Sequence, residues 1–256
     1  LRTAAEHAAE KHDEELFKQP PPEEDCPICF LMMPTYPSGY KYYTCCGKVI
    51  CSGCVYAPVY DNQGNKVDNQ KCPFCRIPTP YTYEEAVERE KKRVDLGDRI
   101  AICRTGNCYR DGAYGFPQDM DKALELWQRA AELGLPKAYG SIGYSYNNGR
   151  GLEIDKKKAT YYYELAAIGG CAQARHNLGC SEGMAGNMER ALKHYMISGR
   201  DGYAESLEII KRMYKDELAT KEDYTKALQS YQKYLSEIKS TQRDKAAAVF
   251  EDCRYY

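Results

Sequence analysis

The chain has 256 residues, enough for two modest domains or for one domain with an attached module. Charged residues make up 29% of the sequence but nearly balance, at a formal net charge of -1, so no broad basic surface can attract phosphate backbones. No apolar run is long enough to cross a bilayer. We therefore expect a soluble chain without a membrane span and without a nucleic-acid partner.

The stretch from Leu1 to Lys18 is charged and helix-prone, and it lacks the apolar core of a signal peptide. The sequence predicts a short polar helix over Ala4 to Phe17, followed by a linker at Pro20 to Pro22, where proline cannot continue a helix. Because the first residue is not methionine, we interpret the chain as a fragment or a processed form.

Cysteine is concentrated in one segment, where eight of the 13 cysteines fall between residues 26 and 75. Closely paired cysteines without a secretion signal favour a metal site over disulfides, so we expect a reducing location, cytoplasmic or nuclear. Zinc prefers four such ligands, and a two-residue gap lets one turn bring both sulfurs to about 2.3 Å from the ion. We predict two tetrahedral zinc ions held by four pairs: Cys26 and Cys29, Cys45 and Cys46, Cys51 and Cys54, Cys72 and Cys75.

The eighth ligand is the open question in this set. No histidine occurs in the sequence between His12 and His176, so the eighth ligand is either Cys45 or absent. Adjacent cysteines on one ion are sterically awkward, which leaves Cys45 as the ligand to test. The two thiolate shells would carry a formal charge of about -4 together, and nearby cations are expected to offset it without touching the metal. These cations are Lys41, Lys48, Lys71 and Arg76.

The second half of the chain repeats itself. Alanines recur at steps of 36, 32 and 36 residues, each followed four positions later by an aromatic residue. A period of this length predicts an array of helical repeats, in which neighbouring units must stack to bury their apolar faces. The alanine and aromatic pairs are Ala123 and Trp127, Ala159 and Tyr163, Ala191 and Tyr195, and Ala227 and Tyr231.

One unit, residues 134 to 170, shows the expected construction. Helices are predicted over about Pro136 to Asn147 and Asp155 to Ala167, separated by a turn at Gly149 to Gly151, where glycine permits the left-handed backbone that ends a helix. Small residues let the two backbones approach, and the large aromatic fills the space between units.

The tracts Ala138 to Tyr146 and Gly149 to Asp155 resemble the Sel-1-like repeats, which are relatives of the tetratricopeptide repeats. The resemblance covers residues 97 to 239 as four units. It departs at the third unit, where the turn around Gly183 to Asn187 is four residues short, and at the first, where Thr105 replaces a leucine. We expect irregular packing at both places.

The cysteine segment resembles a RING finger through the tracts Cys-Pro-Ile-Cys, Cys-Gly-Lys-Val-Ile-Cys-Ser-Gly-Cys and Cys-Pro-Phe-Cys-Arg. Lys48 stands where many members of that family have a histidine ligand. The family pairing implies that the first cysteine pair joins the third on one zinc, and the second joins the fourth on the other. The implied fold is mainly α: a small two-zinc cross-brace RING domain followed by an α-helical solenoid of Sel-1-like repeats.

The same resemblance implies roles for residues that are not ligands. Ile28 and Pro73 would dock a ubiquitin-conjugating enzyme, and Arg76 would contact both that enzyme and its ubiquitin. Pro58 lies where many ligases have a bulky aromatic residue, and it should shorten the central helix. The order of RING, repeats and C-terminal tail also resembles a RING and Sel-1-like repeat family of diatoms. The expected divisions are 1–19, N-terminal helix; 20–80, RING; 81–96, connecting helix; 97–239, repeats; 240–256, capping tail.

Two functions are consistent with this organisation. In one, the chain is a RING-type ubiquitin-protein ligase that recruits a conjugating enzyme and its ubiquitin, holds a substrate protein on the repeats, and forms no covalent intermediate. In the other, it is a non-catalytic adaptor whose zinc module is a second interaction surface. We expect no catalytic residue: His194 is interpreted as a packed or surface residue, and the cysteines outside the zinc segment as small buried side chains, although two of them lie near His176. These cysteines are Cys103, Cys108, Cys171, Cys180 and Cys253.

Overall fold

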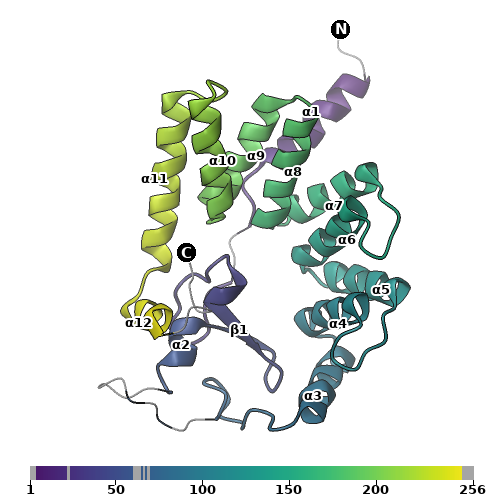
Figure 1. Ribbon diagram of the computed structural model, residues 1–256, viewed down its shortest axis with the longest axis vertical. Helices are drawn as coiled ribbons and strands as arrows, with labels where there is room; N and C mark the ends of the chain where they lie inside the picture. Colours follow the sequence, from purple (N-terminus) through teal and green to yellow (C-terminus); the bar gives the residue numbers. More distant parts are fainter. Residues whose placement is uncertain (1–3, 22–23, 60–64, 66, 68–69, 250–256) are drawn as a thin grey trace. The chain divides into compact units, whose positions relative to one another are not determined.

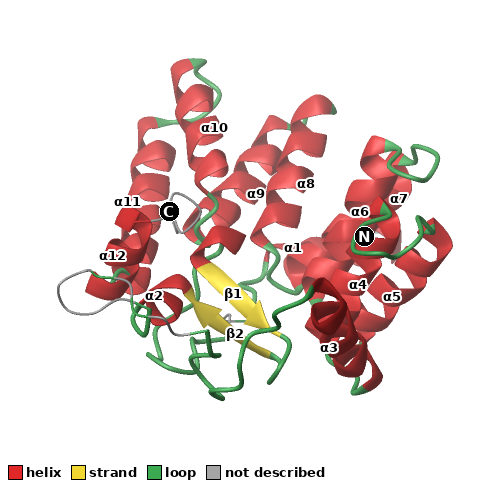
Figure 2. Ribbon diagram, turned by 60° about the horizontal axis from the view of Figure 1, so that its bottom comes forward, coloured by secondary structure: helices red, strands yellow, loops and turns green. Residues whose placement is uncertain are grey.

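The computed structural model describes residues 4–21, 24–59, 65, 67 and 70–249, and the chain is mainly α-helical (Figures 1 and 2). It divides into two compact units, which we call the array unit (Leu1–Pro22 and Ala131–Ser230) and the cysteine unit (Glu23–Ala130 and Tyr231–Tyr256). Within the described ranges, none of the helices has both the length and the apolar character needed to span a bilayer.

The array unit consists of antiparallel helix pairs, together with the N-terminal helix. Helix α6 packs against α7 and α8 against α9, while α7 also contacts α8 and α9 contacts α10 (Figure 1). The helices are α1 (Ala4–Phe17), α6 (Pro136–Asn148), α7 (Lys156–Ile168), α8 (Ala172–Met184), α9 (Met188–Arg200), α10 (Ala204–Lys215) and the first part of α11 (Lys221–Ile238).

The cysteine unit contains the only strands in the described part of the chain, a two-stranded antiparallel sheet in which Tyr40 pairs with Cys51 and Tyr43 with Lys48 (Figure 2). Its elements are η1 (Pro37–Gly39), β1 (Tyr40–Tyr43), β2 (Lys48–Cys51), α2 (Ser52–Tyr56), α3 (Tyr83–Asp95), α4 (Arg99–Asp111), α5 (Met120–Glu132), the end of α11, and α12 (Thr241–Val249).

This division differs from the ranges expected from the sequence. Residues 81–130 and the end of the chain group with the cysteine segment and not with the other repeats. Helix α12, expected to cap the array, packs on α2, where a Cβ atom added to Gly53 would lie 2.8 Å from the backbone nitrogen of Arg243. Helix α12 thus lies in the cysteine unit, and the capping role expected for residues 240–256 stays a prediction.

Helix boundaries follow the local signals in the sequence. Helix α1 has the bounds predicted for it, and α6 and α7 begin and end within one residue of the predicted ranges. The Asp155 side chain accepts a hydrogen bond from the Lys158 backbone N–H at 3.0 Å and so caps the start of α7. Gly149, at φ 66°, ends α6 in the left-handed conformation.

The repeat register brings a glycine of one helix against the aromatic ring of the next. A Cβ atom added to Gly143 in α6 would lie 2.7 Å from Tyr163 in α7, and one added to Gly179 in α8 would lie 2.7 Å from Tyr195 in α9. In the cysteine unit, Gly106 in α4 has the same relation to the indole of Trp127, also at 2.7 Å. The aromatic period thus marks where paired helices approach most closely.

Both departures from the repeat pattern are visible in the structure. Only residues 185–187 connect α8 to α9, whereas residues 149–155 connect α6 to α7, so the third unit has the shorter turn that was predicted. Thr105 is buried in α4, and its hydroxyl has no hydrogen-bond partner among the described residues. A buried hydroxyl without a partner destabilises the position that leucine occupies in the repeat family.

Gly143→Ala should destabilise the array unit by about 1–3 kcal/mol, because the added methyl group would overlap the Tyr163 ring. Gly183→Ala is the matched control in α8: its new Cβ would lie 3.9 Å from that of Ala191, an ordinary contact. That control should be neutral or stabilising, since alanine favours helix over glycine by about 1 kcal/mol. Urea denaturation followed by circular dichroism measures both, and equal effects would contradict the packing argument.

Candidate metal centre

The first and last cysteine pairs lie in two copies of one turn. The backbone N–H of Phe30 donates to the Cys26 carbonyl at 2.9 Å, and that of Arg76 donates to the Cys72 carbonyl at 3.0 Å. Phe30 and Arg76 are both left-handed, at φ 57° and 64°. Residues other than glycine rarely adopt this conformation, so the repeated strain indicates a constraint shared by the two loops.

The two central pairs lie on the β-hairpin and the helix after it. Cys45 and Cys46 occupy the turn between β1 and β2, which closes through Gly47, at φ 69°, whose N–H donates to the Tyr43 carbonyl at 2.8 Å. Cys51 ends β2, and Cys54 follows one turn later in α2. One cysteine pair therefore lies at the turn of the hairpin, and the other lies where the hairpin leads into α2.

The eight sulfurs gather into two interleaved groups. Within each group, the four sulfurs lie within 4.8 Å of one another. The first group combines the first and third pairs, and the second combines the second and fourth, the arrangement that the RING resemblance implied. The groups are Cys26, Cys29, Cys51 and Cys54, here called the first cluster, and Cys45, Cys46, Cys72 and Cys75, here called the second cluster.

The sulfur spacing fits a tetrahedral metal shell. With metal to sulfur bonds of about 2.3 Å, tetrahedral geometry separates the sulfurs by about 3.8 Å. The distance between Cys29 and Cys51 is 3.7 Å, and that between Cys46 and Cys72 is 3.8 Å. Cys45 lies 3.4 Å from Cys75, so the backbone accommodates two adjacent cysteines in one group. Each cluster could thus hold one ion such as zinc.

Without a metal, the thiols of a cluster compete for protons. Hydrogen bonds from the Cys51 and Cys54 thiols lower the pKa of Cys26, whereas burial raises the pKa of Cys45 and raises that of Cys46 to about 11. Four such groups cannot all ionise at neutral pH unless a cation compensates them. A bound dication would displace these protons, so metal binding should be accompanied by proton release.

Sequence reasoning missed the buried cation beside the first cluster. Arg243 in α12 is fully buried, and its Nη1 donates to the carbonyls of Met32 at 2.9 Å and Ile238 at 2.6 Å. Its Nη2 lies 3.9 Å from the Cys29 sulfur. Only the packing of α12 makes Arg243 a neighbour of this cluster, because the four cysteines lie 189 to 217 residues earlier in the chain, and no sequence spacing indicated it.

The cations that the sequence suggested are placed differently. Lys41, Lys48, Lys71 and Arg76 have exposed side chains. Lys41 lies over the ring of Tyr43, with its Nζ 5.4 Å from the centroid. Lys48 contributes its backbone N–H, which hydrogen-bonds to the Cys46 sulfur. Backbone amides and one arginine, more than lysine side chains, therefore surround the sulfurs.

The residues expected to dock a partner lie on the two strained loops. Ile28 is 36% exposed between Cys26 and Cys29, and Pro73 is half-buried between the last pair. Neighbouring apolar side chains, Phe30 and Phe74, are exposed by 76% and 45%. The two loops thus present apolar surface to solvent, as an interaction surface requires.

The histidines set aside from the sequence lie inside the array unit. His176 Nδ1 is 2.8 Å from the Ser206 hydroxyl, and its Nε2 is 3.6 Å from the Cys180 sulfur, so both ring nitrogens have partners. His194 is fully buried, and burial lowers its pKa to about 4. Cys103 and Cys171 are buried as expected, Cys108 is half-buried, and Cys253 lies outside the described residues.

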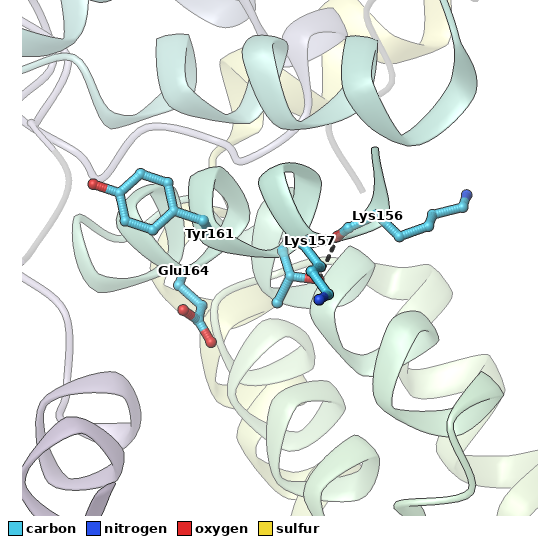
Figure 3. A pocket seen from close by; sticks show the side chains of 5 residues that line it. Lys156, Lys157, Tyr161 and Glu164 are labelled. Atoms are coloured by element: carbon cyan, nitrogen blue, oxygen red, sulfur yellow. Dashed lines mark hydrogen bonds between the residues drawn. The ribbon is translucent and has the colours of Figure 1, made fainter. Parts of the chain in front are cut away.

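A shallow hollow lies on α7 (Figure 3). It has a volume of about 390 Å³ and is lined by Lys156, Lys157, Thr160, Tyr161 and Glu164. Tyr161 and both lysines are exposed, and the Thr160 hydroxyl donates to the Lys156 carbonyl of its own helix. Its residues come from one helix and do not converge on a common point, so we assign it no chemistry.

Elemental analysis should find two zinc ions per chain, because the structure gathers two four-sulfur groups. Cys45→Ser should reduce the count to one, since three thiolates hold zinc weakly. Cys103→Ser removes a buried thiol of α4 outside both clusters and is the control that should keep two. One zinc in the unaltered chain would exclude the second cluster as a site.

Arg243→Ala should weaken metal retention by the first cluster roughly tenfold to a hundredfold, the usual effect of removing an outer-shell partner. Arg243→Lys should recover only part of the loss, because lysine keeps the charge but not the forked donors. Competition with a chromophoric chelator measures both, and Arg99→Ala, a change at a surface ion pair with Glu24, is the control. Equal weakening of both clusters would argue against a local role for Arg243.

Comparison with known proteins identifies the repeats. The family model of the Sel1 repeat matches residues 99–135 and 136–171. Chitin synthase regulatory factor 4 of Schizosaccharomyces pombe is 29% identical over 133 residues, which are 52% of this chain and 21% of that protein. The ERAD-associated E3 ubiquitin-protein ligase component HRD3B of Arabidopsis thaliana is 38% identical over 91 residues, which are 33% of this chain and 15% of that protein.

A solved structure supports the same conclusion. A Sel1 repeat protein from Oxalobacter formigenes superimposes with a TM-score of 0.52 at 28% identity, covering 60% of this chain and 64% of that one. The chain spans about a fifth of the length of the two curated relatives, or less. Residues 99–171 therefore carry two Sel1 repeats, and the fold of the helical part is that of Sel1-repeat proteins.

Proposed function

We propose that residues 26 to 75 form a two-zinc RING-type module that recruits a ubiquitin-conjugating enzyme, and that the repeats hold the protein to be modified. The observation that carries the proposal is the interleaving of the two four-sulfur clusters. This arrangement ties the first loop to one cluster and the last loop to the other, and both loops carry apolar side chains exposed to solvent.

The proposed metal is structural. Each zinc would be held by the four cysteines of one cluster, and a closed four-sulfur shell supplies rigidity and no open position for water. The chain's own contribution is then to position the partners. Ile28 and Pro73 would contact the conjugating enzyme, and Arg76 would orient the ubiquitin thioester by forked hydrogen bonds. The attacking amine belongs to the substrate lysine, which the complex brings close to the thioester.

The relatives support a role for the repeats in protein interaction. One of them is named as a component of a ubiquitin ligase, and another as a regulator of chitin synthase. These names share regulation or assembly of other proteins and not a common reaction. We infer that the Sel1 repeats of this chain bind a partner protein, which in the ligase proposal is the substrate.

A second candidate is a non-catalytic adaptor, and one observation favours it. Helix α2 ends at Tyr56, after five residues, and Pro58 follows one residue later, after Ala57. A helix of this length agrees with the shortening expected from Pro58, and the bulky aromatic residue that many RING ligases have at that place is absent from this position of the sequence. One face of α2 is also covered by α12. In this case the two loops would bind a protein without transferring ubiquitin.

Ile28→Ala should reduce ubiquitin transfer more than tenfold, because truncating a central apolar anchor commonly costs about 2 kcal/mol or more of binding. Arg76→Ala should slow transfer more than it weakens docking, since its role is orientation. Autoubiquitination with a panel of conjugating enzymes measures transfer, and zinc analysis of each variant shows that the module is intact.

Ile154→Ala is the matched control, because Ile154 is an exposed isoleucine of the array unit, at 63% exposure. If the unaltered chain is inactive with every enzyme in the panel, the adaptor function replaces the ligase proposal. If it is active and both variants match it, the docking surface lies elsewhere.

A further inference from the structure

The N-terminal helix packs into the array unit at its C-terminal end. Leu16 is fully buried in a cluster with Tyr163 of α7 and Leu178 of α8. The Phe17 ring lies 4.7 Å from the imidazole of His194 in α9, measured between ring centroids. Residues 6–12, by contrast, are exposed, although His12 Nε2 lies 3.4 Å from the Glu164 carboxylate of α7. The buried part of the attachment is therefore formed by two apolar side chains at the C-terminal end of α1.

Charged groups reinforce the same end of the helix. Asp13 forms an ion pair with Arg190 of α9 at 2.5 Å, and the Arg190 guanidinium also lies 5.4 Å from the centroid of the Phe17 ring. Asp13, Leu16 and Phe17 are spaced at i, i+3 and i+4, so their side chains share one face of α1. The array unit thus binds three side chains of α1: an acidic residue, a leucine three positions later and an aromatic residue four positions later.

A buried arginine recognises the end of the helix itself. Arg175 of α8 is 1% exposed, and its guanidinium donates to the carbonyl of Leu16 at 2.6 Å and to that of Ala167 at 2.7 Å. The last carbonyls of a helix have no partner within the helix and carry its negative dipole end. Arg175 can therefore donate a capping hydrogen bond to the last carbonyls of any helix that ends at this point.

One feature of the contact opposes permanent attachment. His194 has no hydrogen-bond partner for either ring nitrogen among the described residues, although Phe17 packs against it and it is fully buried. Covering a polar group without a partner is unfavourable. Departure of Phe17 would let water reach the imidazole, so the unpaired histidine favours release. Pro20 and Pro21 follow α1 and cannot extend it.

We propose that α1 is an intramolecular ligand of a helix-binding groove, the α1 groove, formed by Tyr163, Arg175, Leu178, Arg190 and His194. The groove binds a partner protein through a helix that ends in the pattern acidic residue, two variable residues, leucine, aromatic residue. While α1 occupies the groove, it excludes that partner. The proposal concerns the array unit alone and does not depend on zinc or on ubiquitin transfer.

The test uses the full chain and a fluorescent peptide of residues 4–19, with binding followed by anisotropy. Leu16→Ala combined with Phe17→Ala disables the internal copy and should raise the peptide's affinity roughly tenfold or more over the unaltered chain, where tethered α1 competes at high effective concentration. A peptide with the same two substitutions should not bind. Arg175→Ala, added to the double variant, should remove binding of the unaltered peptide.

A milder pair of variants guards against misfolding. Asp13→Ala breaks only the ion pair with Arg190 and should raise peptide affinity by a smaller factor, whereas Glu14→Ala makes the same change of charge at an exposed neighbour and should not.

Equal affinity of the peptide for the unaltered chain and for the double variant would overturn the proposal. So would loss of helical circular dichroism in the double variant, because α1 would then be part of the core. A concentration-dependent dimer of the unaltered chain, abolished by the double substitution, would overturn the intramolecular arrangement in favour of a second copy.

Discussion

Paired helices approach so closely that an aromatic ring of one helix packs against a glycine of the other and leaves no room for a Cβ atom. Gly143 packs against Tyr163 in this way, and Gly179 packs against Tyr195. Backbones that approach this closely leave room for a flat ring and exclude a methyl group. The regular spacing of alanine and aromatic residues in the sequence results from this constraint. Once the spacing within a pair is set, the faces that remain apolar must be covered by the next pair, which gives the stacked arrangement of Sel1 repeats.

A different constraint organises the cysteine unit. Four sulfurs per cluster come from loops far apart in the sequence, so a small hairpin and a five-residue helix suffice where a larger apolar core would otherwise be needed. The strained positions of Phe30 and Arg76 fall directly after a cysteine pair in both loops. Strain of this kind persists only where the surroundings determine the backbone, and both positions lie directly beside a cysteine of a four-sulfur group.

Two fully buried arginines attach the ends of the chain to the units in which they lie. Arg175 donates to a carbonyl of α1 in the array unit, and Arg243, on α12, donates to carbonyls in the loop after the first cysteine pair in the cysteine unit. Each donates to backbone carbonyls of neighbouring elements, and each joins a terminal helix to the rest of its unit. Arg175 lies in the proposed α1 groove, and Arg243 lies beside the first cluster.

The sequence by itself determined the repeat period, the bounds of α1, α6 and α7, and the pairing of cysteines into candidate ligands, because these depend on spacings of a few residues. It did not reveal the partners of Arg175 and Arg243, or that α12 belongs with the cysteine segment. Those contacts join atoms 159 and 211 residues apart. Their acceptors are backbone carbonyls, which every residue type carries, so no pattern of side chains could indicate them. Only the tertiary structure decided which carbonyl each arginine would meet.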